Sequence, residues 1–149
     1  MKLFKRICLA LAIVFVGIQL LPIKTNQSEE ASSGSFENTY KIPEDVKRIL
    51  TISCYDCHSN NTNYPWYSKI QPMGWLIEKH INNGKKVLNF SEIGHYSNRK
   101  KISKLKSIIS QVEKNEMPLA SYLLIHHDAK LSKEDQKNLI DFFNHLIDE

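Results

Sequence analysis

Five consecutive residues, Cys54-Tyr55-Asp56-Cys57-His58, constrain this chain more than any other segment. The pattern C-x-x-C-H is the attachment signature of c-type haem. Two thiols add across the vinyl groups of one porphyrin edge, and a single helical turn places both sulfurs along that edge. The adjacent histidine then reaches the iron from the proximal side. The motif therefore predicts one covalent haem c, held by Cys54 and Cys57, with His58 as the proximal ligand.

Three other interpretations of the paired cysteines stay open. A zinc half-site needs a second ligand pair, but Cys8 lies in an apolar N-terminal block and His126-His127 lack the required spacing. A thioredoxin-like redox pair needs a βαβ context, and the chain reads as helical. A structural disulfide leaves His58 without a role. Haem attachment accounts for all three side chains, and it is the interpretation that we favour.

The N-terminus has the pattern of an export signal. A basic segment, residues 1–6, precedes 17 uncharged residues, 7–23, in which Gln19 is the only strongly polar side chain. A membrane span needs roughly 17–25 apolar residues, and no small-x-small cleavage site follows. We expect residues 1–23 to be an uncleaved signal anchor in the cell membrane, with the N-terminus cytoplasmic and the rest on the periplasmic side. A cleaved signal peptide is the alternative.

The remainder divides into a linker and one domain. Residues 24–35 are rich in Ser, Glu and Asn and lack apolar periodicity, which is typical of a flexible tether. Residues 36–149 are expected to form the c-type haem-binding domain. The formal net charge of +4 arises partly from the basic N-terminal segment. The charge balance therefore gives no reason to expect a nucleic-acid partner.

Helical spacing of apolar residues dominates the domain, and no segment shows sustained strand alternation. The predicted helices are residues 43–53, 73–83, 97–115 and a last one that begins at Ser132. Gly84 is expected to stop the second helix, and Ser132 with Asp135 to form a capping box. We therefore expect an all-α, cytochrome c-like domain of four or five helices with long loops, preceded by the N-terminal apolar anchor helix. A large apolar cofactor would explain the long loops.

The second axial ligand is expected to be Met117, since electron-transfer haems commonly carry Met or His there. Met117 precedes Pro118 and lies 59 residues after His58, in front of the C-terminal helix. This order of elements resembles the class I cytochrome c fold, in which a Met-Pro loop reaches the iron. An open, five-coordinate iron is one alternative. The other candidate ligands are Met73, His80, His95, His126, His127 and His145.

Aromatic side chains near the motif are the expected ring contacts of the porphyrin, namely Trp66, Tyr67 and Trp75. Ordinary aromatic packing is the alternative for each of them. A ligating histidine normally donates its Nδ1–H to a carbonyl, which fixes the ring. We expect that carbonyl at Pro65 or Pro72, where prolines make the loop rigid.

The wider sequence resembles a bacterial family called the haem-binding domain, over residues 36–149. The matching segments are residues 54–60, 64–67, 88–92, 116–119, 122, 124–126 and 129–132. The resemblance implies a single-haem, cytochrome-like domain whose partners are mostly undefined. The chain departs from the pattern at Ile93, where Trp is frequent, and at His127, where Pro is common. Ser91, within the segment 89–92, is expected to cap a helix.

Two functions follow from these expectations. The first is a membrane-tethered monohaem c-type cytochrome in electron transfer, whose partner is an unidentified redox protein. The basic stretch 99–106 would steer an acidic partner, although a solvated helix face explains it equally. The alternative is a haem-based sensor or small-ligand binder with a labile sixth position. We expect no enzymatic activity, because no phosphate loop, nucleophile elbow or paired-carboxylate motif occurs.

Overall fold

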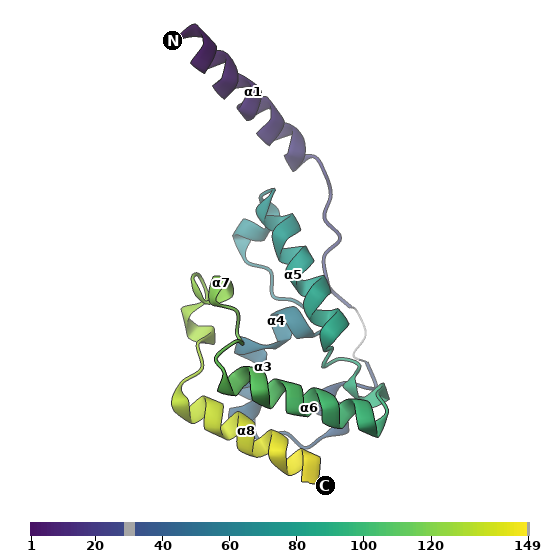
Figure 1. Ribbon diagram of the computed structural model, residues 1–149. Helices are drawn as coiled ribbons and strands as arrows, with labels where there is room; N and C mark the ends of the chain where they lie inside the picture. Colours follow the sequence, from purple (N-terminus) through teal and green to yellow (C-terminus); the bar gives the residue numbers. More distant parts are fainter. Residues whose placement is uncertain (29–31, 149) are drawn as a thin grey trace.

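The computed structural model describes residues 1–28 and 32–148, and its regular elements in these ranges are all helical (Figure 1). The all-α prediction is confirmed, but the described part of the domain after the N-terminal helix has seven α-helices where four or five were expected, because three of them are only about one turn long. The longer helices are α1 (Lys2–Gln19), α3 (Glu44–Ser53), α5 (Met73–Val87), α6 (Asn98–Glu113) and α8 (Lys133–Asp148). The short α-helices are α2 (Phe36–Thr39), α4 (Tyr55–His58) and α7 (Ala120–Leu123). The 3-10 turns are η1 (Trp66–Lys69), η2 (Ile93–His95) and η3 (His127–Ala129).

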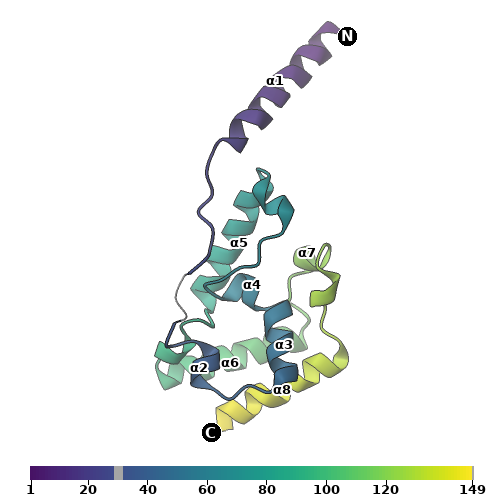
Figure 2. The same ribbon diagram turned by 180° about the vertical axis from the view of Figure 1, so that it is seen from behind.

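The hydrophobic core lies where α3, α6 and α8 pack together, with α2 against them (Figure 2). Phe36, Leu50 and Phe143 have at most 1% of their surface exposed. The ring of Phe36 meets the ring of Phe90 edge-on at 5.3 Å. Burial of each large side chain contributes roughly 1.5–3 kcal/mol. This core positions the site, because α3 leads directly into α4 and α5 lies against it.

The predicted helix boundaries agree with α3, α6 and α8 to within a residue or two. The expected stop at Gly84 is wrong, since α5 continues to Val87. No glycine in the described part of the chain has a positive φ, so Gly84 does not form a left-handed helix end. It packs instead against α4, where a Cβ on Gly84 would lie 2.6 Å from the carbonyl oxygen of Cys57.

The N-terminal apolar segment forms α1, which ends at Gln19, four residues before the predicted end of the anchor. Its uncharged part, residues 7–19, is about 20 Å long at 1.5 Å per residue. The hydrocarbon core of a bilayer is about 30 Å thick. Within the described ranges, no helix combines the length and apolar character that crossing a membrane requires.

The predicted tether is partly fixed to the domain. Residues 29–31 lie outside the described residues. Before them, the Asn26 N–H donates to the hydroxyl of Tyr64 (2.6 Å), and Asn26 Nδ2 donates to Ser59 O (2.9 Å). After them, Ser35 Oγ accepts from the N–H of Asn38 (3.2 Å) and caps α2. Asn26 and Ser35 are therefore parts of the folded unit and not free linker residues.

Ser132 and Asp135 form the predicted capping box at the start of α8. Ser132 Oγ accepts from the N–H of Asp135 (3.0 Å), and Asp135 Oδ2 accepts from the N–H (3.0 Å) and Oγ (2.7 Å) of Ser132. Ser132→Ala is expected to lower the free energy of unfolding by about 1 kcal/mol. Urea unfolding measures this difference, and Ser103→Ala on the exposed side of α6 is the control, expected to be neutral or slightly stabilising because alanine has the higher helix propensity.

The effect of Ser132→Ala should depend on pH. The hydroxyl of Ser132 lowers the pKa of Asp135 from its ordinary value of 3.8, chiefly through this hydrogen bond, and Arg48 adds to the shift. A depressed folded-state pKa contributes stability that is present above the unfolded pKa and is lost as the pH falls through the folded one. The difference between wild type and Ser132→Ala should therefore shrink below pH ~4. A constant difference down to pH ~2 would contradict the carboxylate's part in the cap.

Candidate functional site

The C-x-x-C-H motif forms a single helical turn, α4, directly after α3. The N–H groups of His58 and Cys57 both donate to the carbonyl of Cys54, at 3.0 and 3.3 Å. Both cysteines are free thiols and half-buried. The pKa of Cys54 is raised to about 12 by burial and by the nearby Cys57 thiol, and that of Cys57 to about 11 by burial and by the Asp56 carboxylate. The turn therefore presents two uncharged thiols at neutral pH.

The ring of His58 is fixed by the backbone at the end of α5. Its Nδ1 lies 3.1 Å from the carbonyl oxygen of Leu88. Because a carbonyl only accepts, Nδ1 carries the proton and Nε2 is left free to bind a ligand. Burial lowers the pKa of His58, which favours the neutral ring. The expected acceptor at Pro65 or Pro72 is wrong, and no sequence signal marks Leu88, because every residue has a carbonyl.

Residues 89–92 hold the loop that follows the motif, and Asn60 is the centre of their contacts. The N–H of Asn60 donates to Ser91 Oγ (2.9 Å), and its Nδ2 donates to Glu92 Oε1 (3.0 Å). Asn60 Oδ1 accepts from Asn89 Nδ2 (2.9 Å). The expectation that Ser91 caps a helix is therefore wrong, since its hydroxyl accepts from Asn60 instead. The segment fixes the exit of the C-x-x-C-H turn.

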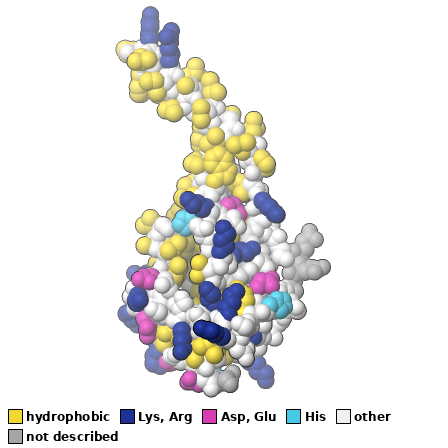
Figure 3. Space-filling model, turned by 45° about the vertical axis from the view of Figure 1, so that its right-hand side comes forward, with side chains coloured by type: hydrophobic (Ala, Val, Ile, Leu, Met, Phe, Trp, Pro, Cys, Tyr) yellow, Lys and Arg dark blue, Asp and Glu magenta, His cyan; other side chains and the backbone are white. Residues whose placement is uncertain are grey.

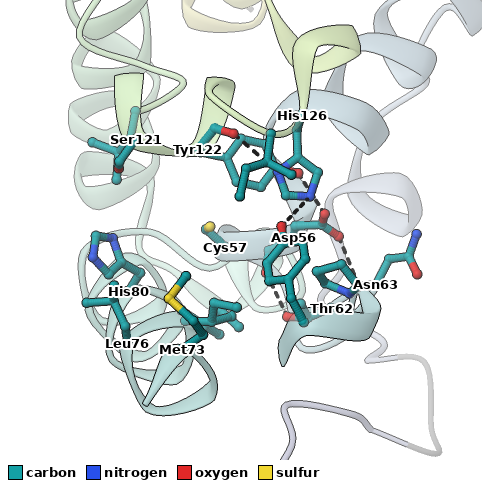
Figure 4. Close-up of a pocket in the computed structure, with 16 residues that line it drawn as sticks. Asp56, Cys57, Thr62, Asn63, Met73, Leu76, His80, Ser121, Tyr122 and His126 are labelled. Atoms are coloured by element: carbon teal, nitrogen blue, oxygen red, sulfur yellow. Dashed lines mark hydrogen bonds between the residues drawn. The ribbon is translucent and has the colours of Figure 1, made fainter. Parts of the chain in front are cut away.

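Three adjoining cavities surround the motif. The cavity at the motif itself has a volume of about 310 Å³, and both cysteines, His58 and Met117 line it. A second, of about 330 Å³, shares Cys54, His58 and Met117 and extends along α6. A third, of about 220 Å³, shares Cys57 and extends between α5 and α7 (Figure 4). Ligand pockets commonly have volumes of about 300–1,000 Å³, so the three form a slot large enough for a sizeable apolar group.

A hydrogen-bonded group closes one side of the third cavity (Figure 4). The hydroxyl of Tyr122 on α7 donates to Asp56 Oδ2 (2.8 Å). The Tyr122 ring stacks on His126 at 4.0 Å, and His126 Nε2 lies 3.2 Å from the hydroxyl of Tyr67. These contacts hold the chain segment after Met117 against α4. Nothing in the sequence marks Asp56 as a residue of the site, although it lies inside the motif, because only the fold places Tyr122 opposite it.

The predicted aromatic contacts divide between the slot and the surface. Tyr67 lines the third cavity. Trp66 and Trp75 line none of the three, and their exposed fractions are 74% and 38%. The structure thus brings one of the three predicted rings to the slot.

The alternative sixth ligands differ in which of the three cavities they line. His80 lines the cavity at the motif as well as the third cavity. Met73 and His126 line the third cavity only. His95 is exposed and pairs with Glu92 at 3.0 Å. His58 and Met117, the two expected axial ligands, both line the cavity at the motif and the cavity along α6. None of the alternative ligands lines both of these cavities.

The fold and the site together define an all-helical protein whose C-x-x-C-H turn faces an apolar slot. Residues 13–145 match the family model described as the haem-binding domain, and the chain belongs to this family. The match begins within α1, upstream of the predicted boundary at residue 36. No curated protein and no solved structure shows a significant match to the chain.

The residues present fit a haem. Two thiols, an imidazole with a free Nε2 and a thioether surround adjoining cavities, and these are the donors that c-type haem uses. Gly84 lets α5 pack directly on the turn that carries two of these donors. A Cβ there would lie 2.6 Å from Cys57 O and 3.4 Å from His58 Cε1. Helix α5 therefore approaches the turn so closely that no side chain fits between them.

Proposed function

We propose that this chain is a monohaem c-type cytochrome that acts in electron transfer. The observation that carries the proposal is the pairing of His58, fixed by Leu88 O, with Met117 in the same two cavities. In this proposal Cys54 and Cys57 hold the haem through thioethers, His58 is the proximal ligand and Met117 the distal one. The bound group supplies a one-electron Fe(III)/Fe(II) couple.

The residues around the slot support this role. The Leu88 carbonyl orients the His58 ring and raises its basicity as a ligand. The methionine thioether favours the reduced state and so a relatively high potential. The bond between Tyr122 and Asp56 holds the segment that carries Met117 close to the turn. In this proposal the protein carries electrons and does not catalyse a reaction of its own.

The proposal extends to location and partner. The chain is exported, and its apolar N-terminal segment holds it at the membrane with the haem domain on the periplasmic side. Its partner is a redox protein. Exposed Arg99, Lys100 and Lys106 on α6 would attract acidic partners and accelerate their encounter.

The test is spectroscopic, on the full chain produced with cytochrome c maturation machinery. The pyridine haemochrome is expected to show thioether-bonded haem, and the reduced protein six-coordinate, low-spin bands. Carbon monoxide is expected to bind the reduced wild type slowly. Met117→Ala should bind it at least about tenfold faster. A Met117 thioether that must leave the iron first would raise the activation free energy of binding by about 1.4 kcal/mol or more, and 1.4 kcal/mol corresponds to tenfold in rate.

Met73→Ala is the matched control for this experiment. Met73 lines only the third cavity, so its loss should leave the rate of carbon monoxide binding unchanged. Rapid and complete binding to the wild type would overturn ligation by Met117. It would indicate a haem-based sensor or small-ligand binder with a labile sixth position instead.

A further inference from the structure

Five large apolar side chains are exposed where η1 leads into α5. They form what we call the apolar corner: Trp66 (74% exposed), Leu76 (49%), Ile70 (39%), Met73 (38%) and Trp75 (38%). Both tryptophans of the chain are among them. Soluble proteins rarely expose a large patch of neighbouring apolar side chains unless a partner covers it. Tryptophan is enriched at the interface between membrane and water, where its ring contacts both phases.

The end of α1 is bonded to this corner. Gln19 Oε1 accepts from the N–H of Gln71 (2.9 Å), and Gln19 Nε2 donates to Gln71 O (3.2 Å). One side chain thus satisfies both backbone groups of Gln71, a residue that is only 3% exposed. Ile23 packs on α5, since a Cβ on Gly74 would overlap Ile23 Cδ1. The only strongly polar side chain in the apolar run therefore ties α1 to the corner.

The surface of α1 is apolar on all sides. Leu3, Leu9, Ile13 and Val16 are each more than 60% exposed. In Figure 3 hydrophobic side chains cover this helix down to the domain, and its basic side chains lie at the far end. A helix that is hydrophobic all round belongs in a protein core or in a membrane. No core of this chain receives α1, since none of its residues is buried.

We propose that the apolar corner lies in the headgroup region of the lipid bilayer, beside the point where α1 enters it. This inference rests on the proposed membrane tether and adds a second contact to it. The bonds of Gln19 to Gln71 keep the corner next to the end of α1, so inserting α1 brings the corner to the bilayer surface. Exposed Lys69 lies in the same turn and would pair with anionic headgroups.

The contact orients the haem slot. Met73 and Leu76 belong to the apolar corner and also line the third cavity. Ile125, 55% exposed, lines the same cavity from the opposite side, next to α7. A bilayer that covers the corner therefore also lies against the wall of the slot. Electron exchange then takes place close to the membrane, with a partner held in or on it.

The experiment uses the haem-loaded full chain in vesicles of phosphatidylcholine and phosphatidylglycerol, with and without bromine on the acyl chains near the headgroups. Bromine quenches only tryptophans within the bilayer. Haem quenches tryptophan equally in both kinds of vesicle, so the ratio of the emission in brominated vesicles to that in unbrominated vesicles reports the bromine effect alone. Trp66→Phe leaves Trp75 as the reporter, and Trp75→Phe leaves Trp66. Both reporters are expected to lose most of their emission in brominated vesicles.

A matched control carries a single tryptophan outside the apolar corner. Ile102 on α6 is 38% exposed, as Trp75 is, but lies outside the corner. Ile102→Trp in the Trp66→Phe, Trp75→Phe background is expected to keep its emission.

Flotation with the vesicles and the haem spectrum are recorded for every variant. A chain that floats with the membrane while Trp66 and Trp75 stay unquenched overturns the corner contact but leaves the tether. A folded, haem-loaded chain that does not float overturns the tether and the corner together, and leaves the haem assignment intact.

Discussion

Replacing Cys57 with alanine is expected to abolish covalently bound haem, whereas replacing Cys8 with alanine should leave it unchanged. Cys57 lies in the α4 turn and lines two of the three cavities. Cys8 is exposed in α1 and lines none of them. Without Cys57, only the Cys54 thiol remains to form a thioether, whereas the proposed attachment needs two. The pair of variants separates attachment by the motif from unspecific reaction of a thiol.

The measurement is haem staining of the denatured protein together with the pyridine haemochrome spectrum. His58→Ala gives an independent variant, since it removes the proximal ligand and keeps both thiols. It is expected to lose holoprotein as well, because nothing then orients the iron on that side of the slot. Full covalent haem in Cys57→Ala or in His58→Ala would overturn the assignment of the site.

Short-range patterns predicted the parts of this protein that depend on neighbouring residues. The helices α3, α6 and α8 follow from apolar spacing, because each of them buries one face against the same core. The capping box at Ser132 needs only a residue three positions away. The C-x-x-C-H turn is likewise contiguous, so its donors could be named from the sequence alone.

Contacts between distant residues were missed. The acceptor for His58 is a carbonyl 30 residues further along the chain, and a carbonyl leaves no mark on the sequence. Asn60 and residues 89–92 form one hydrogen-bonded group across a similar separation. Trp66 and Trp75 lie near the motif in the sequence, but the turn from η1 into α5 directs both to the surface. Proximity along the chain therefore did not predict proximity in space.

Gly84 shows how tertiary packing overrides a local rule. A glycine at the end of an apolar run usually ends a helix, yet α5 continues past this one for three residues. The reason is the backbone of α4, which lies where a side chain at position 84 would be. The glycine is required by the approach of two helices and not by its own backbone conformation.

Gly84→Ala is therefore expected to destabilise the domain by about 1–3 kcal/mol, as overpacking of a close contact does. In a helix without such a contact, the same change stabilises by up to about 1 kcal/mol. The new Cβ would lie 2.6 Å from Cys57 O, so α5 and the α4 turn must move apart. His58 Cε1 is 3.4 Å from the same position, so the low-spin haem spectrum should change as well.

Gly17→Ala is the matched control, since a Cβ on Gly17 meets nothing within 4 Å. Urea unfolding of the haem-loaded chains, followed by the haem absorption, should give an unchanged or higher midpoint for Gly17→Ala and a lower one for Gly84→Ala. A midpoint for Gly84→Ala at or above that of wild type, with an unaltered haem spectrum, would show that α5 does not press on the haem-binding turn. The close approach of Gly84 to α4 would then lose its role in holding Cys57 and His58 in place.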